Sequence, residues 1–254
     1  MRLPAIFTLS ISPLDYPKTH YINSTFNTEV QRGYRSSTTQ FIAEISKQHI
    51  PELIATTNYD ITVELTLEEL GIPYIAIAHI FGNSKYLGRL LCYENLAADS
   101  NVVTVTQMNE TLLDLEEKKE QRVIIYKMHG SSRPADTLKK IDSVILTEND
   151  YVRFLAQDTC RHIPMRVQRK LAEARLLYLG YSLQDWNFRV LLTKIRDMQN
   201  SPGKKTEKRS IDRRHWACVL DPDPVEKQFW AERGVTLYSI DLREFLLRLC
   251  AELR

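Results

Sequence analysis

From residue 38 onward, short apolar runs alternate with longer stretches whose apolar residues recur every three or four positions. The stretch TTQFIAEISKQHI (38–50) places Phe41, Ile42 and Ile45 on one face of a helix. The run ELIAT (52–56) that follows has the length and composition of a short buried strand. The pattern therefore predicts helices and strands that follow one another along the chain.

This alternation continues to the C-terminal end. The predicted strands are 52–56, 73–80, 101–107, 122–130, the first part of 143–158, 175–182, 214–220 and 235–240. The predicted helices are 38–50, 61–71, 109–120, the second part of 143–158, 164–174, 185–198, 223–234 and 242–253. Residues 199–210 form a polar linker, and Gly71 is the expected stop of the helix that precedes it.

The predicted strands are rich in Val, Ile and Leu on both faces, and most are followed by a helix. Such strands are typical of a parallel sheet that helices cover on two sides, so we expect an α/β fold. Residues 1–37 show no regular pattern, and we expect an irregular N-terminal segment there, followed by one domain over 38–254.

Composition removes several classes of protein. The 254 residues are 43% hydrophobic and 26% charged, which is ordinary for a globular protein. The net charge of +2 is too small to indicate a surface that binds nucleic acid. The four cysteines form no CxxC pair, so neither a structural zinc site nor any other metal site is predicted. No apolar run is long enough to cross a membrane, and the N-terminus lacks the pattern of a signal peptide, so we expect a cytoplasmic protein.

Polar side chains gather directly after three of the predicted strands. These are TTNYD (56–60), KMHGSS (127–132) and LGYSLQDWN (179–187). Ligands of an open parallel sheet bind beyond the carboxyl ends of the strands, where such turns converge. We therefore expect the three turns to form one site that offers an amide, an imidazole, carboxylates and a backbone that glycine leaves accessible.

Each turn also has a purely structural interpretation. Asp60 and Asp185 have the position of helix caps, which accept hydrogen bonds from the first free N–H groups of a helix. His129 has the position of a histidine satisfied at a strand end. Caps explain each turn alone, but not why all three occupy the same place in a strand–helix unit.

The ordered set of motifs resembles the sirtuin-like proteins over about residues 40–250. The motifs are Thr57-Asn58-Tyr59-Asp60, His129-Gly130-Ser131, and Gly180-Tyr181-Ser182-Leu183 with Asp185. The set is most similar to the prokaryotic sirtuin-like domains that cleave NAD in anti-phage defence. VILTENDYVRFL (144–155) and the tail 221–246 are also similar to that branch.

The resemblance implies a Rossmann-type, mostly parallel sheet with helices on both faces, formed by 38–254, with NAD as the substrate. It implies two catalytic residues, Asn58, which positions water and ribose hydroxyls, and His129, which acts as general base or proton relay. The implied cofactor-binding residues are Thr57, Asp60, Gly180, Tyr181, Ser182 and Asp185. The implied partners are NAD and, as a further expectation, a second copy of the chain or other defence proteins.

The sequence departs from the family at its start. The family opens with a strand and a glycine-rich turn, Gly-Ala-Gly-x-Ser, that holds the pyrophosphate, whereas the first glycine of this chain is Gly33. Two explanations are open: a strand, turn and helix lie upstream of Met1, or the protein is a catalytically inactive module for nucleotide binding or assembly. Protein deacylation is the weaker alternative, because deacylases of the family usually carry a zinc domain with paired cysteines.

Overall fold

The computed structural model describes residues 5–8, 36–48, 51, 53–80, 86, 88–94, 101–132, 144–145, 150, 163–180, 193 and 215–252, with the backbone alone for 5–8 and 48. The predicted elements within 143–158 and 185–198 and the linker 199–210 lie almost entirely outside them.

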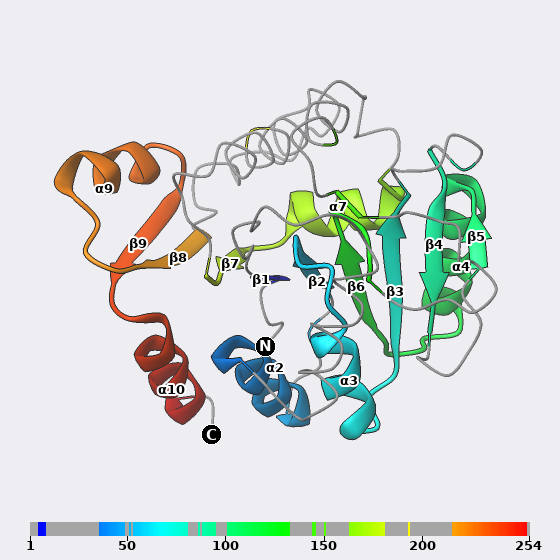
Figure 1. Ribbon diagram of the computed structural model, residues 1–254, viewed down its shortest axis with the longest axis horizontal. Helices are drawn as coiled ribbons and strands as arrows, with labels where there is room; N and C mark the ends of the chain where they lie inside the picture. The colour runs from blue at the N-terminus through cyan, green and yellow to red at the C-terminus, as the bar shows by residue number, and fades with distance from the viewer. Residues whose placement is uncertain are drawn as a thin grey trace.

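Within the described residues the chain forms one nine-stranded sheet, in the order β5-β4-β3-β6-β2-β1-β7-β8-β9 (Figure 1). The strands are β1 (Ala5–Thr8), β2 (Leu53–Thr56), β3 (Tyr74–His79), β4 (Leu90–Tyr93), β5 (Asn101–Val103), β6 (Val123–Lys127), β7 (Leu176–Tyr178), β8 (His215–Val219) and β9 (Val235–Ser239). Neighbouring strands are parallel from β3 to β9, while β4 and β5 add an antiparallel edge.

The described helices cover both faces of the sheet. One face carries α2 (Ser37–Gln48), α3 (Thr62–Glu69) and α10 (Leu242–Glu252), and the other carries α4 (Val105–Glu117), α7 (Met165–Glu173) and α9 (Pro224–Ala231). Successive strand residues point to opposite faces, so Ile54 packs with α2 and α3 while Leu53 and Ala55 pack in the core under α4 and α7. The predicted α/β Rossmann-type fold is confirmed. No described helix has both the length and the apolarity needed to cross a membrane.

Several helices begin next to a short polar residue whose side chain accepts a hydrogen bond from one of the free N–H groups of the first turn. The Oγ of Ser36 accepts from the backbone N of Thr39 at the start of α2, at 3.2 Å. Asp223 accepts from the N of Glu226 at the start of α9, at 2.7 Å. At the end of α3, Gly71 adopts φ +65, a conformation that glycine favours, which confirms the predicted stop.

The strand β1 corrects the expectation for the N-terminal segment. Residues 1–37 show no regular sequence pattern, yet Ala5–Thr8 form a strand in the middle of the sheet, between β2 and β7. Residues 5–8 therefore supply a central strand of the sheet. The pattern fails here because Ala5–Thr8 become a strand through their pairing with β2 and β7, which the local sequence does not reveal.

The prediction of a strand over 101–107 was partly wrong. β5 ends at Val103 and helix α4 begins at Val105, because Thr104 forms a capping box with Gln107. The N of Thr104 donates to Oε1 of Gln107 at 2.8 Å, and the N of Gln107 donates to Oγ1 of Thr104 at 3.2 Å. The preceding strand, β4, lies where no element was predicted.

Candidate functional site

The site lies where the strand order reverses. β1 lies between β2 and β7; the strand that follows β1 along the chain, β2, lies on one side of the β1–β7 pair, and the strand that follows β7, β8, lies on the other. In doubly wound sheets this divergence opens a crevice beyond the carboxyl ends of the strands. The turns after β2, β6 and β7 all leave the sheet at this edge, since these strands are parallel.

The strand register brings two of the predicted residues to one level. Thr56 of β2 pairs with Lys127 of β6, and Asn58 and His129 each follow their paired residue by two positions. Both therefore lie just beyond the same edge of two hydrogen-bonded neighbouring strands. The N of Met128 donates to the carbonyl of Thr56 at 2.9 Å, which extends the ladder toward them.

The first turn, 57–60, is held by its own side chains. Thr57 is buried, and the half-buried Asn58 donates from its backbone N to Oγ1 of Thr56 at 3.0 Å. Asp60 accepts at Oδ1 from the backbone N of Thr62 at 2.9 Å and from the Thr62 hydroxyl. Asp60 thus organises the start of α3, as the structural interpretation of this turn predicts, although the residue next to the helix is Ile61.

His129 is buried, with 6% of its surface exposed. Burial lowers the pKa of His129 to about 4, because the charged imidazolium loses its hydration. The imidazole is therefore neutral at pH 7 and has one ring nitrogen that can accept a proton. Its carbonyl accepts from the N of Ile145 at 3.0 Å, and the next residue, Gly130, adopts φ 89.

The third turn is described only at its start. Gly180 follows β7 by two residues, is half-buried and adopts φ +69, a conformation that glycine favours. Because glycine has no side chain, a ligand can approach the backbone closely at this edge of the sheet. Tyr181, Ser182 and Asp185 lie outside the described residues. Their predicted roles in cofactor binding stay predictions.

Comparison with known families agrees with this geometry. The SIR2-like domain matches residues 52–238, which is more than half of the chain. The chain belongs to the SIR2-like domain family. No curated protein matches it.

The matched range of the SIR2-like domain begins one residue before β2 and includes all three polar turns. SIR2-like domains generally bind NAD, and the edge just described is where a Rossmann-type sheet holds a dinucleotide. In the part of the chain that the structure describes, no group of His, Cys, Asp or Glu side chains has the arrangement of a metal site.

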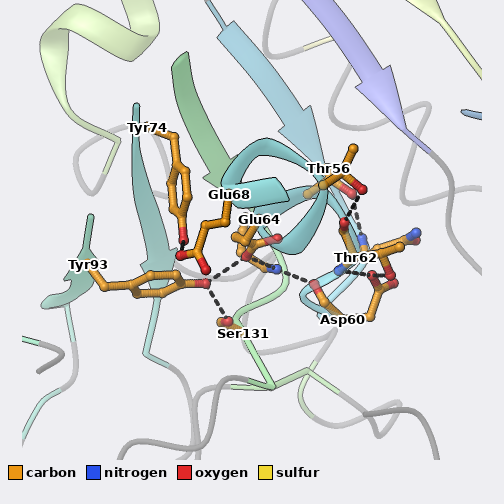
Figure 2. Close-up of polar contacts among 11 residues, drawn as sticks. Thr56, Asp60, Thr62, Glu64, Glu68, Tyr74, Tyr93 and Ser131 are labelled. Carbon is orange, nitrogen blue, oxygen red and sulfur yellow. Dashed lines mark hydrogen bonds and ion pairs between the residues drawn. The ribbon is translucent and has the colours of Figure 1, made fainter. Parts of the chain in front are cut away.

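The structure of this SIR2-like domain also contains a buried polar network that sequence reasoning missed (Figure 2). Nζ of Lys127 lies 2.6 Å from Oε1 of Glu64, and each side chain has 1% of its surface exposed. The same Nζ donates to the carbonyl of Asp60. The hydroxyl of Tyr93 lies 2.8 Å from Oε1 of Glu64 and 2.8 Å from Oγ of Ser131.

A sequence signal for this network exists. Lys127 ends an otherwise apolar strand, and Glu64 lies on the inner face of α3, between the buried Val63 and Thr66. A lone charge in a buried strand is costly unless a partner is buried with it, which predicts an opposite charge nearby. The pattern does not say which of the many acidic residues is that partner.

Proposed function

We propose that this SIR2-like domain binds NAD beyond the carboxyl ends of β1, β2, β6 and β7 and cleaves the bond between nicotinamide and ribose. The observation that supports the proposal most directly is the placement of Asn58 and His129 at one level, on neighbouring strands of that edge. An amide that orients water and a neutral imidazole that accepts its proton are the groups this hydrolysis needs.

The chemistry follows from the charges. When the bond between C1′ of the ribose and N1 of nicotinamide breaks, its electron pair leaves with the nicotinamide and neutralises the pyridinium. Positive charge then develops on the ribose, and oriented dipoles such as the amide of Asn58 stabilise it. Water adds to C1′, and the proton that it loses passes to the neutral ring of His129.

Burial of His129 fits the role of base rather than acid. A pKa of about 4 keeps the imidazole ring neutral around pH 7, and the neutral ring is the form that can accept a proton. The same low pKa makes His129 a weak base, and a weak base suffices here because the water that adds to the cationic C1′ becomes strongly acidic. Thr57, Asp60, Gly180, Tyr181, Ser182 and Asp185 complete the proposed NAD site.

The test is incubation of the 254-residue protein with millimolar NAD and chromatographic detection of nicotinamide. Asn58→Ala and His129→Ala should each lower the rate by about two to four orders of magnitude, the range for a lost positioning or acid–base group. His215→Gln is the matched control, because His215 is equally buried but begins β8 at the opposite edge of the sheet. An unmodified protein that releases no nicotinamide, or full activity in both site variants, would overturn the proposal.

A second function is favoured by one observation. Between β1 and α2 the sequence contains a single glycine, Gly33, so it lacks the glycine-rich motif whose backbone N–H groups usually hold a pyrophosphate. The alternative is a SIR2-like module that binds nucleotide or assembles with other proteins without cleaving NAD. Binding of ADP-ribose without release of nicotinamide from NAD would support this alternative.

The biological setting that we propose rests on the resemblance of the motifs to NAD-cleaving defence domains. In that setting the protein acts in the cytoplasm of a prokaryote during phage infection. It works there as a homo-oligomer or together with other defence proteins.

A further inference from the structure

The Lys127–Glu64 pair joins two segments that are far apart in sequence. Lys127 is the last residue of β6, two positions before His129, while Glu64 lies on α3 just after the turn that contains Asn58. Nζ of Lys127 also donates to the carbonyl of Asp60, inside that turn. The buried Nζ of Lys127 therefore ties the start of the turn 127–132 to Asp60, at the end of the turn 56–60.

Tyr93 adds a third contact from β4, as Figure 2 shows. Its phenol has one hydrogen, which it donates to Oε1 of Glu64 at 2.8 Å. The hydroxyl of Ser131 must then donate to the phenol oxygen, also at 2.8 Å. Burial, and next the charge of Glu64, raise the pKa of Tyr93 well above its ordinary value, so the phenol stays protonated and keeps this arrangement.

Backbone hydrogen bonds also join the two turns. The two turns touch directly through the N of Met128 on the carbonyl of Thr56, at 2.9 Å, and the N of Ser132 on the carbonyl of Tyr59, at 2.6 Å. His129 lies between these two contacts. Ser131, which Tyr93 contacts, is next to the second of them.

We propose that Glu64, Lys127 and Tyr93 are positioning residues, which set the distance and orientation between the turns of Asn58 and of His129. This inference rests on the proposed NAD-cleaving function. Apolar side chains of the same size fill such a space at least as stably as a buried ion pair, but they specify no angle or register. Directional hydrogen bonds to Asp60, Glu64 and Ser131 do specify them.

A pair of tyrosine variants separates positioning from simple stability. Tyr93 and Tyr74 are equally buried, and each donates to a glutamate of α3 at 2.8 Å, Tyr93 to Glu64 and Tyr74 to Glu68. Tyr74 begins β3, two residues before Ala76, which pairs with Tyr93, so the two tyrosines are neighbours at the same end of the sheet. Tyr93→Phe removes a bond to Glu64, the partner of Lys127, whereas Tyr74→Phe removes the same kind of bond to Glu68, one helical turn further along α3.

We expect Tyr93→Phe to lower kcat for nicotinamide release at least tenfold with little change in KM, and Tyr74→Phe to stay within about twofold of the unmodified protein. In Tyr93→Phe, amide hydrogen exchange by mass spectrometry should rise in 57–60 and 128–132. Tyr74→Phe should leave both segments unchanged. Lys127→Arg, which keeps the charge and a donor, should retain more activity than Lys127→Gln.

Equal kcat and equal exchange in the two tyrosine variants would overturn the positioning role, even if the unmodified protein cleaves NAD. If the unmodified protein releases no nicotinamide, the proposed function fails. The exchange measurement then still decides whether the network couples the two turns.

Discussion

Lys127 and Glu64 form an ion pair of 2.6 Å in the interior, between the end of a central strand and the helix that packs on it. Removing one member leaves the other charge buried and uncompensated, which costs far more than losing an exposed pair. This relationship leads to the first prediction.

Lys127→Met should lower the free energy of unfolding by about 3–5 kcal/mol, measured by urea denaturation. Adding Glu64→Leu to it should recover part of that loss, since no unpaired charge then remains inside. The control is Lys47→Met, which breaks the exposed Lys47–Glu44 pair of 3.1 Å and should cost less than about 1 kcal/mol. Similar losses for Lys127→Met and Lys47→Met would contradict the buried pair.

His129 should make stability depend on pH in acid. The unfolded chain binds a proton at His129 near pH 6.5, whereas the folded protein binds it only near pH 4. As the pH falls from 6.5 to 4, the unfolded state is therefore favoured, and the contribution reaches about 3 kcal/mol. Below pH 4 both states are protonated and this contribution is constant.

The measurement is the free energy of unfolding between pH 7 and pH 4 for the unmodified protein and for His129→Gln. Carboxyl groups titrate in both proteins, so the difference between the two curves isolates His129. We expect the unmodified protein to lose more stability over this range. Parallel curves would show that His129 titrates normally and is accessible to water.

NAD should bind weakly to this chain, because the sequence after β1 contains no glycine-rich motif. Hydrogen bonds from backbone N–H groups to a charged phosphate contribute about 1.5–3 kcal/mol each, or roughly a factor of ten to a hundred in Kd. Replacing residues 9–13 (LSISP) by the family motif, as Gly-Ala-Gly-Ile-Ser, should tighten binding at least tenfold in calorimetric titration.

The matched control for this replacement is Ala-Ala-Ala-Ile-Ser, which changes the same positions without the conformational freedom of glycine. No gain over that control would mean that the turn does not limit affinity. Tight binding by the unmodified chain would show that other groups hold the pyrophosphate.

Cys92 and Cys218 should react slowly with alkylating reagents in the folded protein. Burial, together with Glu94 in the case of Cys92, raises the pKa of each thiol to about 12. At pH 8 the reactive thiolate is then roughly one part in ten thousand. Iodoacetamide labelling followed by mass spectrometry should show both sites unlabelled until urea is added; rapid labelling of either in the native protein would be inconsistent with this burial.

The sequence by itself determined most of the local structure. Apolar runs and helical stripes predicted strands β2, β3, β6 and β8 to within a few residues, and Gly71 marked the end of α3. The polar turns could be placed at one edge because parallel strands that alternate with helices have their carboxyl ends together. For these features the physical cause is local, since it lies in side-chain periodicity and backbone preference.

The tertiary structure decided what depends on partners distant in sequence. β1 and β4 are strands because of the neighbours with which they pair, not because of a clear pattern of their own. Thr104 turns a run of apparent strand residues into a helix start by a contact with Gln107. Lys127 could be recognised in the sequence as a buried charge, but its partner Glu64 lies 63 positions away. Only the packing of α3 on the sheet brings these two charges together, because pairing across the interior depends on distance in space and leaves no periodic signal along the chain.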